Sequence, residues 1–441
     1  MLGSCLALPA HAAPVRLSLA EATARAQANP VARAAILNQR AVEALAAEAR
    51  GARYPRFNLT AFIAPSPDIS CDNADCTRTS PSTAIAPEFD GVFGSVRLEV
   101  LQPLYTFGKL DAAVEAGAHA AQLTSAQADG VIGDMAVETA KAYFGVGLAR
   151  QLAGMLQEGS DQIQKGMQTL NDRLAAGDAD VTVQDRLRLT TFQTEVTLRL
   201  SEAREKELTA LEGLRGLVGE READIAESAF TPVERALGDV DIHLKAAHAG
   251  SPELRMASHG VSALEQRTRL ERARWWPDLG IAGAFQFAHA QGVDEPPSAF
   301  ANNPFNITRA EIGAVMRWQL EPAMQAARVS RAEAEQARAS SLRDAALRLV
   351  EFNVRDAHNR ASQAKVRLEA AQQGEKSARG WVASVMQADA VGTASARDLA
   401  DAYLAYFTLH SRVLQSTYEW NVALAALERA TGELSRLAKR P

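Results

Sequence analysis

Two segments of the chain alternate between apolar and polar residues and then change directly into a long helical pattern. In residues 92–101 every second residue is valine, leucine or glycine, and Arg97 and Glu99 lie among the residues between them. This alternation predicts a strand with one face toward an apolar medium and the other toward water. A helical pattern starts near Lys109 and meets no proline before Pro232. The strand therefore passes into a very long helix.

The order of predicted elements occurs twice. Tyr54-Pro55 follows Asn29-Pro30 at the same spacing as Trp276-Pro277 follows Ser251-Pro252. Matching intervals of this kind predict an internal duplication. The first repeat is predicted over residues 14–220, with helices over 18–53, 109–174 and 184–219 and strands over 56–64 and 91–102. Within 18–53, Asn29-Pro30 predicts a second helix start, with Asn as the N-cap and Pro in the first turn. The second is predicted over residues 248–436, with helices over 252–274, 323–388 and 397–432 and strands over 278–288 and 307–320. Residues 221–247 are expected to link the repeats, and residues 437–441 to form a C-terminal tail.

The predicted strands indicate contact with a membrane. Four strands are too few to close a barrel around water, so a barrel would need strands from several subunits. The apolar faces would then contact lipid, and the charged residues of the other faces would line the lumen: Arg97, Glu99, Arg309, Glu311 and Arg317. The alternative is a soluble antiparallel sheet packed on a core. Helices of about 65 residues, roughly 100 Å long, disfavour it because they leave no globular core beside the sheet.

Composition limits the class of protein. The 441 residues are 47% apolar but only 6% aromatic, and the net charge is −6. This composition is typical of closely packed, alanine-rich helices. The negative net charge gives no reason to expect nucleic-acid binding. No apolar run of about 18 residues predicts a transmembrane helix. No histidines lie four apart on a helix and no nucleophile motif is present, so we expect no enzyme activity, no metal site and no cofactor.

The first residues indicate export. The stretch from Leu2 to Leu8 resembles the end of a hydrophobic signal segment, and Ala10-His11-Ala12 fits a cleavage site, so residues 1–13 are interpreted as a signal-peptide remnant. A frayed cytosolic N-terminus is the alternative. Leu2-Gly3-Ser4-Cys5 also matches a lipoprotein box, which leaves lipidation at Cys5 as a further possibility.

The expected state of two cysteines depends on whether the chain is exported. Cys71 and Cys76 form a close pair in a polar loop, which predicts a disulfide in an exported chain and free thiols in a cytosolic one.

Five motifs occur together in a fixed order. They are Leu19-Ala20-Glu21-Ala22 followed by Asn29-Pro30; Tyr54-Pro55; Gln102-Pro103-Leu104-Tyr105 with Gly108-Lys109; Trp276-Pro277-Asp278-Leu279; and Val391-Gly392 followed by Asp398-Leu399 and Asp401-Ala402. With the duplication, they resemble the TolC-type outer-membrane efflux family over residues 17–436. The resemblance implies a fold that is mainly α with a membrane β-barrel. Each subunit of a homotrimer would give two repeats of helices plus a β-hairpin to a twelve-stranded barrel on a long periplasmic α-helical barrel.

The resemblance also implies a function. Such proteins are passive exit ducts in the outer membrane of Gram-negative bacteria that span into the periplasm and conduct drugs, metals or other small molecules. Their partners are outer-membrane lipid, a periplasmic adaptor protein and an inner-membrane RND, ABC or MFS transporter. A type I protein-secretion channel is the alternative within this class. A soluble long coiled-coil scaffold is the alternative from another class.

The family closes its periplasmic end with a ring of aspartates, and two of these fall on Asp398 and Asp401. Their spacing lets one helix present both to the pore, and three copies would form an acidic ring that repels anions and binds cations. The alternative is that both are solvated carboxylates at a helix start. Asp185 is a further candidate partner in this gate. Gly177, Val391 and Gly392 mark the tips expected to contact the adaptor.

Two departures from the family pattern occur at this end. A tip arginine of the family is here Ala394, and a tyrosine is Asp389. The polar links of the gate are therefore expected to differ from those of the family.

Overall fold

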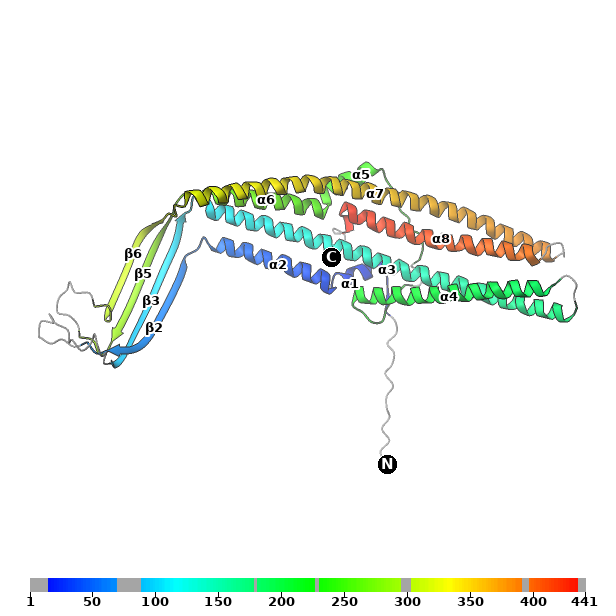
Figure 1. Ribbon diagram of the computed structural model, residues 1–441, viewed down its shortest axis with the longest axis horizontal. Coiled ribbons are helices and arrows are strands. Elements are labelled where there is room, and N and C mark those ends of the chain that lie inside the picture. Colours follow the sequence, from blue (N-terminus) through cyan, green and yellow to red (C-terminus); the bar gives the residue numbers. More distant parts are fainter. Residues whose placement is uncertain are drawn as a thin grey trace, which may run out of the picture. The chain divides into compact units, whose positions relative to one another are not determined.

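The computed structural model describes residues 15–69, 89–177, 181–226, 230–294, 303–390 and 396–434, in which the two halves of the chain share one order of elements. The first half contains α2 (Pro30–Gly51), β2 (Arg56–Pro67), β3 (Phe89–Tyr105), α3 (Lys109–Ala175) and α4 (Val183–Val218). The second contains α6 (Pro252–Ala273), β5 (Asp278–Ala290), β6 (Ile307–Arg317), α7 (Pro322–Ala390) and α8 (Ala396–Thr431). Equivalent helices have 22 and 22, 67 and 69, and 36 and 36 residues. This parallel supports the predicted duplication (Figure 1).

Two helices occupy the range 18–53, and the second begins at Pro30, where Asn29-Pro30 predicts a second helix start. α1 (Leu19–Ala26) ends before Asn29, and α2 begins at Pro30. The Asn29 side chain accepts a hydrogen bond from the Val31 N–H at 3.0 Å and so caps α2. Pro30 has no N–H with which to continue α1, and it is well placed in the first turn of the new helix.

The segment predicted to link the repeats, residues 221–247, contains regular structure. β4 (Ala223–Ile225) pairs in parallel with β1 (Val15–Leu17), and α5 (Val240–Gly250) begins inside the predicted linker. A strand of three residues is too short to leave a periodic pattern in the sequence. Its pairing partner also lies near the other end of the repeat, so the pair becomes visible only in three dimensions.

By its internal contacts the chain divides into two compact units. Unit 1 comprises Met1–Gln39, Leu123–Ser258 and Leu342–Pro441, and unit 2 comprises Arg40–Gln122 and His259–Ser341. In unit 1 a core forms around the β1–β4 pair, and the hydroxyl of buried Tyr143 donates to the Leu17 carbonyl oxygen at 3.1 Å. Aliphatic side chains of α3, α4 and β4 complete this core, including Val146, Leu214, Val218 and Ile225.

Hydrogen bonds from α8 hold another part of the linker in place. The buried Asn421 side chain accepts from the Val233 N–H and donates to the Thr231 carbonyl oxygen, both at 2.9 Å. The Trp420 indole N–H donates to the Val233 carbonyl oxygen at 3.0 Å. The extended backbone of the linker thus finds its partners on α8 rather than in water.

Unit 2 contains a four-stranded antiparallel sheet with the order β2-β3-β5-β6 (Figure 1). β3 continues to Tyr105, beyond the end predicted at residue 102, because its ladder with β5 shifts register between Pro103 and Tyr105. Such an irregularity accepts proline, which has no N–H to donate to a neighbouring strand. β6 ends at Arg317, before the end predicted at residue 320.

The predicted mainly α chain, with two strands from each repeat, is confirmed by this arrangement. Among the helices that the structure describes, none is both long and apolar enough to cross a membrane.

Gly432 provides a test of the packing at the end of α8. Its φ is +78°, and an added Cβ would collide with the Gly250 carbonyl oxygen. We expect Gly432→Ala to lower the free energy of unfolding by at least about 1–2 kcal/mol, the cost of a left-handed conformation for an L-residue. In the control Gly213→Ala, a Cβ on α4 meets nothing within 4 Å. This control should gain up to about 1 kcal/mol from helix propensity. Thermal unfolding in detergent measures both, and equal effects would contradict the assigned packing.

Candidate functional site

The sheet of unit 2 has one apolar face and one polar face. Residues opposite each other in an antiparallel ladder point to the same side, and the ladder pairs Leu98 with Leu59 on one side and with Phe285 on the other. The apolar face defined by this register comprises Phe57, Leu59, Ala61, Ile63, Val96, Leu98, Val100, Ile281, Phe285, Phe287, Ala310, Ile312 and Ala314. Most of its large side chains are exposed, up to 83% for Ile312, and Leu98 and Val100 are half-buried. An apolar surface of this extent marks a contact with a partner or a membrane.

The polar face carries the charged residues that alternation predicts there. By register and alternation these are Arg97, Glu99, Arg309, Glu311 and Arg317. The guanidinium Nε of Arg97 lies 3.1 Å from the Glu99 Oε1, and that of Arg309 lies 2.5 Å from the Glu311 Oε1. About half of each of these four side chains is exposed. The face therefore presents charge to water in the form of pairs.

A sharp turn joins β3 to α3. Phe107 and Gly108 both have positive φ, 51° and 84°, and the helix starts at the next residue. The Lys109 ammonium donates to the Trp276 carbonyl oxygen and to the Asp278 carboxylate, both at 2.7 Å. The rings of Phe107 and Trp276 stack at 5.5 Å. Gly108 therefore permits the turn, and Lys109 anchors the turn to the start of β5.

Asp185 acts as a capping residue of α4. Its carboxylate accepts hydrogen bonds from the Thr182 backbone N–H at 3.0 Å and from the Thr182 hydroxyl at 2.7 Å. These hydrogen bonds hold the pKa of Asp185 below its ordinary value, and the charge of Arg188 adds to the effect. Gly177 follows α3 with a φ of +76°, which suits the turn after a helix. The suggested gating role of Asp185 stays a prediction, but its carboxylate is already engaged in the cap.

Asp401 is linked to a second helix of unit 1. One of its oxygens lies 3.7 Å from the Arg188 guanidinium on α4, and the other lies 4.0 Å from Arg397 on α8. Asp398 lies in the first turn of α8, one helical turn away from Asp401. Sequence reasoning missed Arg188 because no local pattern shows that α4 and α8 approach each other.

Four of the predicted site residues, Cys71, Cys76, Val391 and Gly392, lie outside the described residues, as does Cys5. Elsewhere in the described part of the chain, no group of three or more His, Cys, Asp or Glu side chains has an arrangement that could hold a metal ion.

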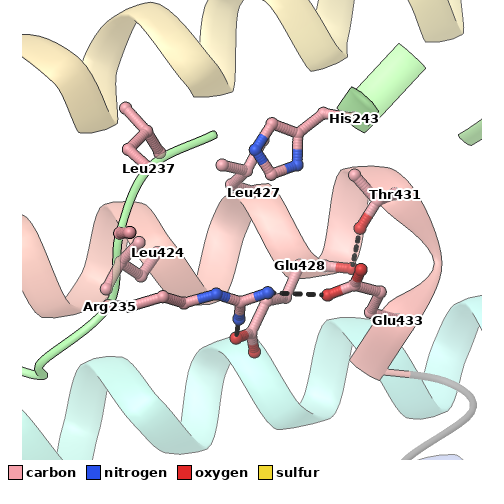
Figure 2. Close-up of a pocket in the computed structure, with 9 residues that line it drawn as sticks. Arg235, Leu237, His243, Leu424, Leu427, Glu428, Thr431 and Glu433 are labelled. Atoms are coloured by element: carbon pink, nitrogen blue, oxygen red, sulfur yellow. Dashed lines mark hydrogen bonds and ion pairs between the residues drawn. The ribbon is translucent and has the colours of Figure 1, made fainter. Parts of the chain in front are cut away.

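A small cavity of about 10 Å³ lies between α5, α8 and the linker in unit 1 (Figure 2). Arg235 reaches across it to the carboxylates of Glu428 and Glu433. Burial raises the pKa of Glu428, against the opposing charge of Arg235. A cavity of this size holds about one water molecule and is too small for a solute. The ion pairs of Arg235 therefore join the linker to α8 rather than bind a ligand.

Comparison with known proteins identifies the family. The model of the outer membrane efflux protein family matches residues 22–220 and 243–433, so it covers each half of the chain separately. The chain therefore belongs to the outer membrane efflux proteins. This membership confirms the predicted family and its efflux function, which is a transport role rather than an enzyme activity.

Individual relatives are distant in sequence. The cobalt-zinc-cadmium resistance protein CzcC of Cupriavidus metallidurans is 24% identical over 259 residues, which cover 57% of this chain and 58% of that protein. The chain thus aligns with little more than half of that relative. The outer membrane protein VceC of Vibrio cholerae shares 18% identity and a TM-score of 0.73, with 94% of this chain and 96% of that chain covered. The CmeC outer membrane channel of Campylobacter jejuni shares 13% identity and a TM-score of 0.73, with 98% and 94% covered. These structures share the fold.

His243, beside the cavity, gives the protein a pH-dependent stability. Burial lowers the pKa of His243, and the charges of His358 and Arg235 add to this effect against the charge of Glu433. Its Nε2 is buried with no hydrogen-bond partner among the described residues. A histidine with a lowered pKa in the folded protein binds its proton more readily when unfolded. The contribution of His243 to the free energy of unfolding therefore falls as the pH drops below the ordinary value of 6.5.

We expect His243→Gln to reduce the loss of melting temperature between about pH 7.5 and about pH 5.5. The control is His289→Gln, which changes an exposed histidine of β5. It should leave the loss unchanged. If the melting temperature of both variants falls as much as that of the parent protein over this pH range, His243 is not the responsible group.

Proposed function

We propose that three copies of this chain assemble into an exit duct that crosses the outer membrane of a Gram-negative bacterium and extends into the periplasm. The observation that supports it best is the exposed apolar face of the sheet opposite a face of paired charges. Three sheets would close into a barrel of twelve strands, with the apolar face toward lipid and the polar face toward the lumen. In the described sheet β2 and β6 are the edge strands, and closure would pair these edges between copies.

The remaining parts of the chain have roles in this assembly. The paired helices α3–α4 and α7–α8 form the periplasmic section, whose tips near Gly177, Val391 and Gly392 contact an adaptor protein. An inner-membrane transporter of the RND, ABC or MFS type supplies the energy, since a duct with fixed charges conducts only down a gradient. The solutes are small molecules such as drugs or metal ions. The name of CzcC, a metal-resistance protein, supports the metal ions.

A pair of neighbouring substitutions in β2 tests the orientation of the sheet. Leu59→Lys places a charge on the apolar face, and Asn58→Lys places the same charge on the polar face, opposite Glu99. We expect Leu59→Lys to abolish the detergent-stable trimer of the outer-membrane fraction, because a lysine facing lipid costs about 2–4 kcal/mol in each copy. Asn58→Lys should assemble normally. Equal assembly of the two variants would contradict the lipid-facing assignment.

The conducting role is tested directly in planar bilayers. Purified protein should insert as a unit and give discrete single-channel currents, and Asn58→Lys should do the same. A protein that stays monomeric in solution without detergent, and gives no current, would overturn the duct and favour a scaffold instead.

The tip is proposed as the gate of this duct. Asp398 and Asp401 of three copies would surround a narrow opening, and the Arg188–Asp401 link would hold α8 against α4. One exposed ion pair contributes about 0–1 kcal/mol, so such a link can break when an adaptor binds. The Arg188–Asp401 link would differ from the polar links of the family, because the family's tip arginine and tyrosine are replaced here by Ala394 and Asp389.

Two variants separate the acidic ring from the ion-pair link. The double variant Asp398→Ala/Asp401→Ala should raise the resting conductance and weaken block by divalent cations, because it removes both the link and the ring. Arg188→Gln should raise the conductance but strengthen the block, because the Asp401 charge remains. Glu202→Ala, an exposed change elsewhere on α4, serves as the control. If Asp398→Ala/Asp401→Ala and Arg188→Gln both leave the resting conductance and the cation block unchanged, the tip is not the gate.

A further inference from the structure

Four of the five charged residues of the polar face lie in two rows across the sheet, and the fifth, Arg317, lies nearer the helices, opposite Asp278. The ladders pair Arg97 with Gln286 and Gln286 with Arg309, so the two arginines lie in one row. They pair Glu99 with Ala284 and Ala284 with Glu311, so the two glutamates lie in the next row. The rows are two residues apart along the strands, or roughly 7 Å. Charge of one sign thus occupies one level of the sheet, and charge of the other sign occupies the next.

Both ion pairs point the same way. Along β3 the chain passes Arg97, then Glu99, and then enters α3; along β6 it passes Arg309, then Glu311, and then enters α7. The glutamate row therefore lies nearer the helices and the arginine row nearer the far end of the sheet. The dipoles of the two pairs add rather than cancel.

The charged strands alternate with uncharged ones. In the two rows, β3 and β6 carry the arginines and glutamates, while β2 contributes Thr60 and Asn58 and β5 contributes Gln286 and Ala284. In the order β2-β3-β5-β6, repeated with β6 beside the β2 of the next copy, every second strand would be charged. Neighbouring like charges would then be evenly spaced at roughly 10 Å, two strand separations.

These distances determine which charges interact. A spacing of roughly 10 Å exceeds the Debye length of about 8 Å at physiological salt, so the like charges of one row largely do not repel each other. Each arginine contacts its own glutamate directly, at 3.1 Å or 2.5 Å. The opposite charges of the two rows are therefore coupled pairwise, and neither sign dominates the field of these rows.

We propose that, in the duct described above, these rows form two bands around the lumen, one of six arginines and one of six glutamates, that set the ionic selectivity of the strand-lined section. Each band follows the tilt of the barrel strands, and the bands are called rings here. This inference rests on the proposed trimeric duct. Because the rings compensate each other, this section passes cations, anions and zwitterions alike. Because all pairs point the same way, it forms a charge step along the pore, and an ion driven from the helix side meets the glutamates first. Such a step makes current depend on the sign of the voltage.

Neutralising one row at a time tests the rings. The variants are Arg97→Gln/Arg309→Gln, Glu99→Gln/Glu311→Gln, and all four together. Each is made in the natural chain and in the Asp398→Ala/Asp401→Ala background, so that the tip does not alone limit the current. Single-channel reversal potentials under a potassium chloride gradient at low ionic strength give the cation-to-anion permeability ratio. Current–voltage curves give the rectification.

The expected results have opposite signs. Loss of the arginines leaves six unpaired glutamates and should raise the permeability ratio severalfold, and loss of the glutamates should lower it severalfold. The fourfold variant should regain the selectivity of its parent channel but lose rectification. If both double variants keep the reversal potential of their parent in both backgrounds, the rings do not set selectivity and the inference is wrong. Absence of current in the parent channel would instead overturn the duct itself.

Discussion

The antiparallel ladder of β2, β3, β5 and β6 is the constraint on which the other features depend. Opposed residues share a face, so a single register assembles the exposed apolar face on one side and the charged rows on the other. A slip by one residue would place Arg97 among the valines and leucines. The anchored turn at Lys109 fixes where β3 ends and α3 begins. The apolar face that results is large and exposed, which is why we propose an assembly in lipid.

Many charged side chains of this protein form close ion pairs with a residue of opposite charge. The net charge is only −6 among 100 charged side chains (47 basic, 53 acidic). Each part of the proposed duct contains close pairs: Arg97 with Glu99 on the sheet, Arg188 with Asp401 near the tip, and Arg235 with Glu428 beside the cavity. Exposed pairs contribute little to stability. Their effect is on the sign of the local field, which matters more in a conduit than in a protein with a thick core.

Prediction from the sequence succeeded where a pattern extends over many residues. The long helices, the four strands and the two faces of β3 follow from periodicity of 3.6 or 2 residues. It failed where one short feature changes the outcome. A shift of register after Pro103 prolongs β3, and β4 has only three residues. Of the candidate site, the charged face was predictable, whereas Arg188 was not.

The sequence by itself determined the alternating strands, the long helices, the repeat and the face on which each charged residue lies. These are local properties, because the direction of a side chain follows from its position in a helix or strand. Only the tertiary structure decided which strands and helices are neighbours. It aligned Arg97 with Arg309 and Glu99 with Glu311 across β5, brought Arg188 to Asp401, and paired β1 with β4. Such contacts join residues far apart in the chain, and they depend on how elements pack rather than on any local pattern.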